Sequence, residues 1–309
     1  MRTLLRGSTA YKIFSRDAAN GTVSHAGMLC FGDGAYLRFA LKYFALALFS
    51  TDESRREGSL IMGESFSDVK IYPAEGKKPS VSDADDILAD SVLRPLEGDK
   101  KLYIFTDFDQ AMPVVQNKLL KLLEDPPQGV YLLLGATSLA PVLPTILSRV
   151  RLLEIPPFPA DAVAAALKRQ GSEGDIASLA AASCGGIFGE AEAMLSGGWF
   201  SSLLQAARDI CSADTLARAG EVSLKYAEVR EKTQLLKLVQ RIYFDRLKAC
   251  LSSPCDGDEK LCRPALLYAV SAVNGALEDV RFNANFSSLL FTLVSRIITE
   301  NDKWKKLLA

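Results

Sequence analysis

The sequence has one histidine, His25, and none of its six cysteines is part of a C-x-x-C pair. A single histidine excludes a metal site built from several histidines, and the missing pair argues against zinc ribbons and thioredoxin-type redox chemistry. Positive charge is not in excess, because 36 lysines and arginines face 37 acidic residues and leave a formal charge of -1. A general electrostatic affinity for nucleic acid is therefore not expected.

Long hydrophobic runs are also missing. The most apolar stretch covers residues 39–49 and contains Lys42, so it is too short for a membrane span and suits a buried helix. Residues 1–6 carry charge with no apolar segment behind them, which is not the pattern of a secretory signal. Because unpaired cysteines are typical of the reducing cytosol, we expect a cytoplasmic protein with no membrane partner.

Apolar residues are nevertheless abundant enough for a large core. They make up 49% of the 309 residues, against 24% charged residues, as in globular proteins of two or three domains at about 150 residues each. In the first half, short apolar runs alternate with helical periodicity, which indicates an α/β domain with a doubly wound parallel sheet. Strands are predicted at residues 28–31, 101–107, 130–134 and 151–155, and helices at residues 36–49 and 113–124.

The run Pro156-Pro157-Phe158-Pro159 ends this alternation, and strand signals are nearly absent beyond it. Proline clusters of this kind mark the ends of regular elements. We expect an α/β domain over residues 1–158, a small helical domain over residues 159–200 and a helical bundle over residues 201–309. The helices of the last two parts are predicted at residues 161–169, 175–183, 188–195, 204–211, 216–226, 233–251, 262–282 and 286–308.

A glycine-containing turn follows the first predicted strand, where a phosphate-binding P-loop would lie. The P-loop signature is G-x-x-x-x-G-K-[ST], in which glycines let backbone amides approach the phosphates, lysine neutralises them and the hydroxyl holds Mg²⁺. Here the second glycine is replaced by Leu37, the lysine by Arg38 and the hydroxyl by Phe39, while Asp33 adds negative charge. The octamer reads Gly32-Asp33-Gly34-Ala35-Tyr36-Leu37-Arg38-Phe39. Taken alone, this octamer indicates an ordinary turn. In its wider context, between a predicted strand and a predicted helix, it indicates a P-loop that has lost its function.

The end of the second predicted strand lacks part of the corresponding acidic motif. P-loop ATPases place a carboxylate there for Mg²⁺, often followed by a second one that orients water. In this sequence Thr106 occupies the first acidic position and Asp107 the second. Asp107 could still accept a hydrogen bond or cap a loop, but we expect no catalysis, bound cofactor or metal ion at this edge.

Several sequence blocks are far more specific. They resemble the "N-x-L-L-K-x-L-E-x-P-P … L-P-T-I-x-S-R-C" region of bacterial clamp-loader subunits in the AAA+ superfamily, and a collar motif, "N-x-N-x-x-L", of the same family. The likeness covers most of residues 22–158 and is thin across the helical remainder. The matching residues are 93–101, 117–127, 132–137 and 143–149, with Asn283-Ala284-Asn285-Phe286, Leu289 and Leu293 in the last helices.

This resemblance implies an AAA+ sheet domain, a small helical lid and a C-terminal helical collar. Among clamp-loader subunits, the ATP-hydrolysing gamma and tau types keep an intact P-loop, an Asp-Glu strand end and usually four zinc-binding cysteines. Here the strand end is Thr106-Asp107, residues 49–69 contain no cysteine, and Glu190 lies where ATP-using relatives place a cation. The resemblance therefore favours the delta prime type, which is commonly unable to hydrolyse ATP.

A delta prime subunit would help to load the sliding clamp onto primed DNA as part of DNA polymerase III, without enzymatic activity of its own. Its implied partners are the gamma or tau and delta subunits, and the clamp and primed DNA through the complex. Ser148-Arg149-Val150 matches the family's Ser-Arg-Cys motif, which implies that Arg149 reaches a neighbouring subunit's ATP. Thr137 matches the sensor position and is expected to be structural.

Two alternatives stay open. One is an active gamma-like ATPase with an unorthodox P-loop, which residues 32–39 disfavour. The other is an AAA+-derived, DNA-associated regulatory protein, which would need a basic helix that the sequence lacks. Without the surrounding resemblance, Arg149 would be interpreted as a surface arginine that caps a loop.

Overall fold

The computed structural model describes residues 1–172, 174–196, 198–252, 263–281 and 285–308. Its internal contacts divide the chain into two compact units. The first comprises Met1–Ala166 together with Gly186–Glu190, and the second comprises Leu167–Gly185 together with Ala191–Ala309. The expected three-part division at residues 158 and 200 stays a prediction.

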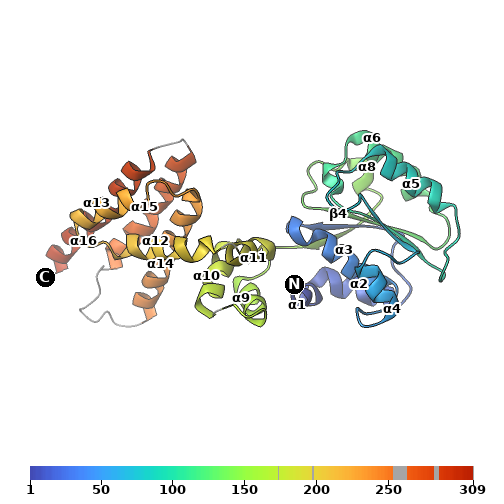
Figure 1. Cartoon of the computed structure of the whole chain (residues 1–309), viewed down its shortest axis with the longest axis horizontal. Helices are drawn as coiled ribbons and strands as arrows, with labels where there is room; N and C mark the ends of the chain where they lie inside the picture. Colours follow the sequence, from blue (N-terminus) through green and yellow to red (C-terminus); the bar gives the residue numbers. More distant parts are fainter. Residues whose placement is uncertain (173, 197, 253–262, 282–284, 309) are drawn as a thin grey trace. The chain divides into compact units, whose positions relative to one another are not determined.

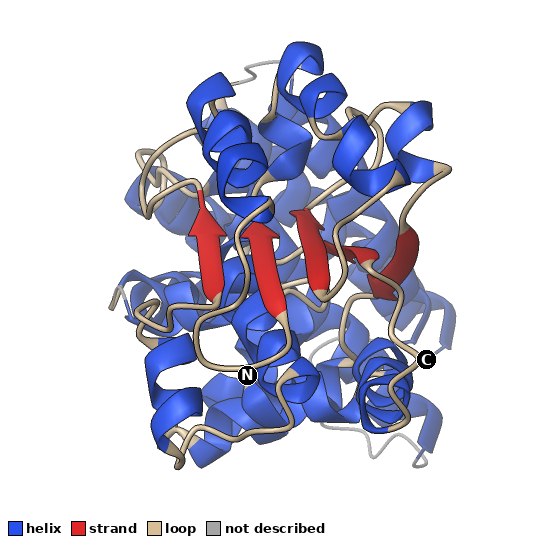
Figure 2. Ribbon diagram, turned by 90° about the vertical axis from the view of Figure 1, so that its right-hand side faces the viewer, coloured by secondary structure: helices blue, strands red, loops and turns tan. Residues whose placement is uncertain are grey.

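The first unit is built on a five-stranded sheet in the order β2-β3-β4-β1-β5. Every pairing between neighbouring strands is parallel, and Figure 2 shows the strands of this sheet as red arrows between the helices. The predicted parallel α/β sheet is thus confirmed. The strands are β1 (Ala26–Phe31), β2 (Val69–Tyr72), β3 (Lys101–Phe105), β4 (Val130–Ala136) and β5 (Arg151–Ile155).

Helices cover both faces of the sheet, with α2, α3 and α4 on one side and α5, α6 and α8 on the other (Figure 1). Two-sided cover explains why the central strands are continuous apolar runs, and all of β3 is buried. The helices of this unit are α1 (Arg2–Gly7), α2 (Thr9–Ala19), α3 (Gly34–Leu48), α4 (Arg56–Met62), α5 (Val81–Ser91), the 3₁₀ turn η1 (Phe108–Gln110), α6 (Pro113–Lys118), α7 (Leu120–Glu124) and α8 (Pro144–Leu147).

Two features of this unit differ from the sequence-based expectation. The edge strand β2 was not predicted, because it is four residues long, contains Lys70 and is only half-buried at most positions. The single helix predicted over residues 113–124 is divided at Leu119 into α6 and α7. Leu119 is itself fully buried, so burial of its side chain against the sheet is retained across the division.

The second unit is helical, as predicted. Within it α14 packs against α12 and α15, and α16 packs against α13 and α15. Residues 253–262 and 282–284 lie outside the described residues, and with them Asn283 and Ala284 of the collar motif. No helix in the described part of the chain is long and apolar enough to cross a bilayer. The remaining helices are α9 (Ala160–Arg169), α10 (Gly174–Ser183), α11 (Phe188–Ser196), α12 (Trp199–Ser212), α13 (Leu216–Lys225), α14 (Lys232–Ser252), α15 (Arg263–Arg281) and α16 (Phe286–Leu308).

Candidate functional site

The connection from β1 to α3, where a P-loop would lie, is short. β1 ends at Phe31 and α3 begins at Gly34, so only Gly32 and Asp33 lie between them. A P-loop needs several non-helical residues whose amides wrap the phosphates. Here residues 34–39 of the octamer already belong to α3, so most of it has a helical and not a loop conformation.

The residues at the positions of the P-loop glycine and hydroxyl pack against other side chains of the unit. Leu37 is 1% exposed, and its Cδ1 atom lies 3.3 Å from the position that a Cβ on Gly135 of β4 would occupy. Phe39 is half-buried and stacks on Tyr43 with ring centroids 6.1 Å apart. Both side chains therefore contribute to apolar packing around α3.

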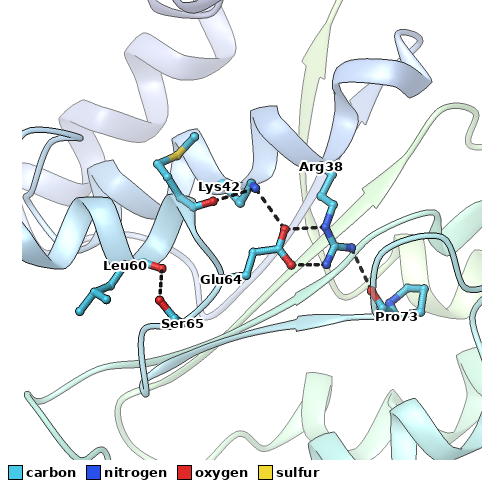
Figure 3. A network of polar contacts seen from close by, with 7 residues as sticks. Arg38, Lys42, Leu60, Glu64, Ser65 and Pro73 are labelled. Carbon is cyan, nitrogen blue, oxygen red and sulfur yellow. Dashed lines mark hydrogen bonds and ion pairs between the residues drawn. The ribbon is translucent and has the colours of Figure 1, made fainter.

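Arg38, at the position of the P-loop lysine, binds a carboxylate of its own chain (Figure 3). Its Nε atom donates to Oε1 of Glu64 at 2.7 Å, and Nη2 donates to Oε2 of the same carboxylate. Nη1 donates to the carbonyl of Pro73 at 2.9 Å, and Lys42 adds a 3.1 Å bond to Glu64. A bidentate arginine–carboxylate pair is geometrically specific and strong, so this guanidinium joins α3 to the loop that follows α4.

After the end of β3, the carboxylate of Asp109 accepts hydrogen bonds from the end of β4. Its Oδ2 atom accepts hydrogen bonds from the Thr137 hydroxyl at 2.6 Å and from the backbone amides of Thr137 and Ser138. Thr106 is buried, and its Oγ1 atom has no hydrogen-bond partner among the described residues. Asp107 takes a left-handed conformation with φ of 52° and precedes the 3₁₀ turn. Thr137 thus binds a protein carboxylate at the end of β4.

Residues 186–190 of the same unit cover the end of β1. Asp33 is 1% exposed, and its Oδ2 atom accepts a 2.7 Å hydrogen bond from the amide of Gly189. The fully buried ring of Phe188 packs edge-on against Tyr36, with centroids 5.4 Å apart. The end of β1 is therefore covered by side chains and backbone of residues 186–190.

Arg149 is on the surface, just after α8. Its Nε atom donates to Glu124 Oε1 at 2.8 Å, and Nη2 lies 2.7 Å from the same oxygen. Nη1 donates to the carbonyl of Thr145 at 3.0 Å and to Oγ of Ser148 at 3.1 Å. The side chain is 37% exposed. The structure thus brings Ser148 and Arg149 together and presents the guanidinium at the surface with Glu124 as its counter-ion.

The comparison with protein families matches this α/β unit. Residues 7–159 match the model of a family described as "DNA polymerase III, delta subunit". The chain belongs to the AAA+ clamp-loader subunits of bacterial DNA polymerase III. The family resemblance stated from residues 117–127 and 143–149 is therefore confirmed, and with it membership in the clamp loader of the DNA polymerase III holoenzyme.

A search of curated proteins gave no match to this clamp-loader subunit. Among solved structures, it is similar to a gamma subunit-related protein of DNA polymerase III from Thermotoga maritima, with 17% identity over 94% of this chain and 98% of that one and a TM-score of 0.40. The Bacillus subtilis DNA clamp loader delta protein has 11% identity, 94% and 99% coverage and a TM-score of 0.39. The T. maritima RuvB Holliday junction branch migration motor has 19% identity, 86% and 91% coverage and a TM-score of 0.43.

Three contact residues of this clamp-loader subunit were not singled out from sequence as partners. Glu64 binds Arg38 across 26 positions, Asp109 binds Thr137 across 28, and Asp33 binds Gly189 across 156. Each is an acid two to four residues beyond the end of a strand or helix. Such acids are common in loops, so only the tertiary contact distinguishes them.

Substitution of Glu64 by glutamine is expected to lower the free energy of unfolding by about 1 to 3 kcal/mol at neutral pH. Hydrogen bonds from Arg38 hold the pKa of Glu64 at about 2, below its ordinary 4.5. Since the folded pKa is the lower one, this stabilisation is complete above about pH 4.5 and is lost as the pH falls through 2.

Urea unfolding of the wild type and Glu64→Gln between pH 7 and pH 3 measures this effect. The stability difference between the two proteins should shrink as the pH falls. The exposed variant Glu57→Gln on α4 controls for the loss of one negative charge. A Glu64→Gln penalty that stays constant over the whole range would contradict the assignment to ion pairing.

Proposed function

We propose that this clamp-loader subunit is of the delta prime type and neither binds nor hydrolyses ATP. The observation that carries the proposal is the β1–α3 junction, where Gly32 and Asp33 alone separate strand and helix. Three further features support the same conclusion. Arg38 pairs with Glu64, the side chain of Leu37 is apolar and buried, and residues 186–190 cover the end of β1. Because phosphate binding needs amides and a cation that face the ligand, no part of this junction suits a nucleotide.

The role of such a subunit is to complete the ring of loader subunits and to act on a neighbour's ATP. Its partners would be gamma or tau and delta subunits, and through the complex the sliding clamp and primed DNA. The surface position of Arg149 supports this role, because a guanidinium exposed beside α8 can be reached by another subunit. The chain would contribute Arg149 to catalysis while performing no reaction alone.

Calorimetric titration of the isolated chain with Mg-ATP is expected to give no binding signal at submillimolar nucleotide. The physical reason is the joint loss of the phosphate-cradling glycine, the lysine, the hydroxyl and the first acidic residue. A clamp-loader subunit with an intact P-loop, titrated under the same conditions, serves as the positive control. A micromolar Kd for this chain would overturn the proposal and favour the gamma-like ATPase.

A further inference from the structure

The segment Gly186–Glu190, which we name the latch segment, belongs to the α/β unit although the chain on both sides of it belongs to the other unit. Contacts of different kinds hold it there. The carbonyl of Gly186 accepts a 3.0 Å hydrogen bond from the amide of Phe158, the buried Phe188 ring packs on Tyr36, and the amide of Gly189 donates to Asp33.

Asp33 provides a buried negative charge at the start of a helix. Gly189 is the second residue of α11, so its amide is among those that have no partner within the helix. A carboxylate at this position satisfies the amide and also interacts favourably with the positive end of the helix dipole. A side chain only 1% exposed cannot rely on water for solvation, and burying a charge without such partners is costly.

The two glycines of the latch segment allow this close approach. A Cβ atom on Gly189 would lie 2.6 Å from Asp33 Oδ1 and 2.9 Å from the Cβ atom of Ala35. Gly186 has a φ of +86°, and a Cβ atom there would lie 2.6 Å from the carbonyl oxygen of Phe158. Both contacts are shorter than a side chain tolerates, and positive φ favours glycine. The backbone is therefore shaped to meet Asp33 and Phe158 directly.

We propose that Asp33 is a built-in anion that keeps the latch segment docked on the end of β1 when no nucleotide is present. Helix N-termini commonly bind phosphate, and here a carboxylate of the same chain takes that place. The inference rests on the proposed function in one respect: an internal anion is needed because the degenerate P-loop holds no phosphate.

Amide hydrogen exchange of the full-length chain, followed by mass spectrometry, tests this proposal. In the wild type, the amides of residues 188 and 189 should be protected. In Asp33→Ala they should exchange about 10- to 100-fold faster, as expected for the loss of a hydrogen bond to a charged group. Asp33→Asn keeps an acceptor oxygen but no charge, so its exchange should be intermediate. Gly189→Ala should resemble Asp33→Ala, because the added methyl group displaces the carboxylate.

Protection of β4 shows whether the α/β unit of each variant is still folded, and the exposed Asp86→Asn on α5 is the matched control. If Asp33→Ala loses protection in β4 as well, its α/β unit is no longer folded. The role of Asp33 is then judged from the exchange of residues 188 and 189 in Asp33→Asn compared with the wild type. Unchanged exchange of residues 188 and 189 in Asp33→Asn, and in Asp33→Ala where β4 stays protected, would overturn the latch.

A second measurement with Mg-ATP separates the latch from the proposed function. Nucleotide should leave the exchange of wild-type residues 188 and 189 unchanged. If ATP alters their exchange, the proposal that the chain does not bind ATP is wrong. The proposed role of Asp33 in holding the latch segment is still supported in that case if Asp33→Ala accelerates exchange without nucleotide. If ATP has no effect and the Asp33 variants also have none, the latch fails and the proposed function remains.

Discussion

Replacing Arg149 with alanine in the reconstituted clamp loader is expected to slow ATP hydrolysis at one neighbouring site by about 10³- to 10⁵-fold. At 1.36 kcal/mol per tenfold, this corresponds to about 4 to 7 kcal/mol of transition-state stabilisation. Because only one of several ATP sites would lose its arginine, total turnover should fall modestly. Productive loading of the clamp onto primed DNA should fall far more, since it requires the sites to act together.

The physical basis is the forked, permanently charged guanidinium, which can bind two γ-phosphate oxygens as negative charge redistributes. In the free chain, Arg149 uses Nε and Nη2 for Glu124 and Nη1 for Thr145 and Ser148. To bind two phosphate oxygens, the Arg149 guanidinium must break some of these hydrogen bonds. The Glu124 pair is exposed and therefore weak, so a polyphosphate can displace it.

Arg149→Lys keeps the charge but loses the fork and should remain impaired, while Arg149→Ala should be worse. Arg55→Ala, which removes a surface arginine that is 67% exposed, controls for the loss of a positive charge. Clamp- and DNA-stimulated ATP turnover and clamp loading are the assays, with assembly checked separately by gel filtration. If Arg149→Ala assembles and loads clamps at the wild-type rate, Arg149 is only a surface residue.

Deletion of residues 205–309 is expected to abolish co-purification with the other loader subunits while leaving a folded α/β unit. The deleted part consists of helices whose described residues include exposed apolar side chains, among them Leu267, which is 59% exposed, and Phe291, which is 43% exposed. Exposed apolar side chains of this size are typical anchors of protein interfaces. Size-exclusion chromatography and pull-down from the reconstituted mixture measure the loss.

A double substitution tests the same surface without deleting structure. Leu267→Asp with Phe291→Asp places charges at exposed positions of α15 and α16, so folding should be retained and assembly weakened by at least about 30-fold. Glu278→Gln, also exposed on α15, is the control for a change of charge outside the apolar residues. If the truncated chain still assembles normally, the oligomerisation interface lies outside residues 205–309.

The sequence was sufficient to predict the parallel sheet, because its central strands are buried on both faces and read as continuous apolar runs. It was not sufficient for β2, whose four residues lie at an edge and include Lys70. It also did not predict the division at Leu119, since the apolar spacing of residues 113–124 continues through it. The helices of the second unit were predicted because long amphipathic periodicity is a local property.

The sequence also predicts a loss of P-loop chemistry at Leu37, Arg38 and Phe39, because phosphate binding depends on the types of residue at fixed spacing, and this stays a prediction. The hydrogen-bond partners of the polar residues around this junction were decided by the tertiary structure alone. Arg38 meets Glu64, Thr137 meets Asp109, and Asp33 meets Gly189 across 156 positions. Sequence spacing carries no information about such contacts, since they exist only where the folded chain brings distant segments within hydrogen-bond distance.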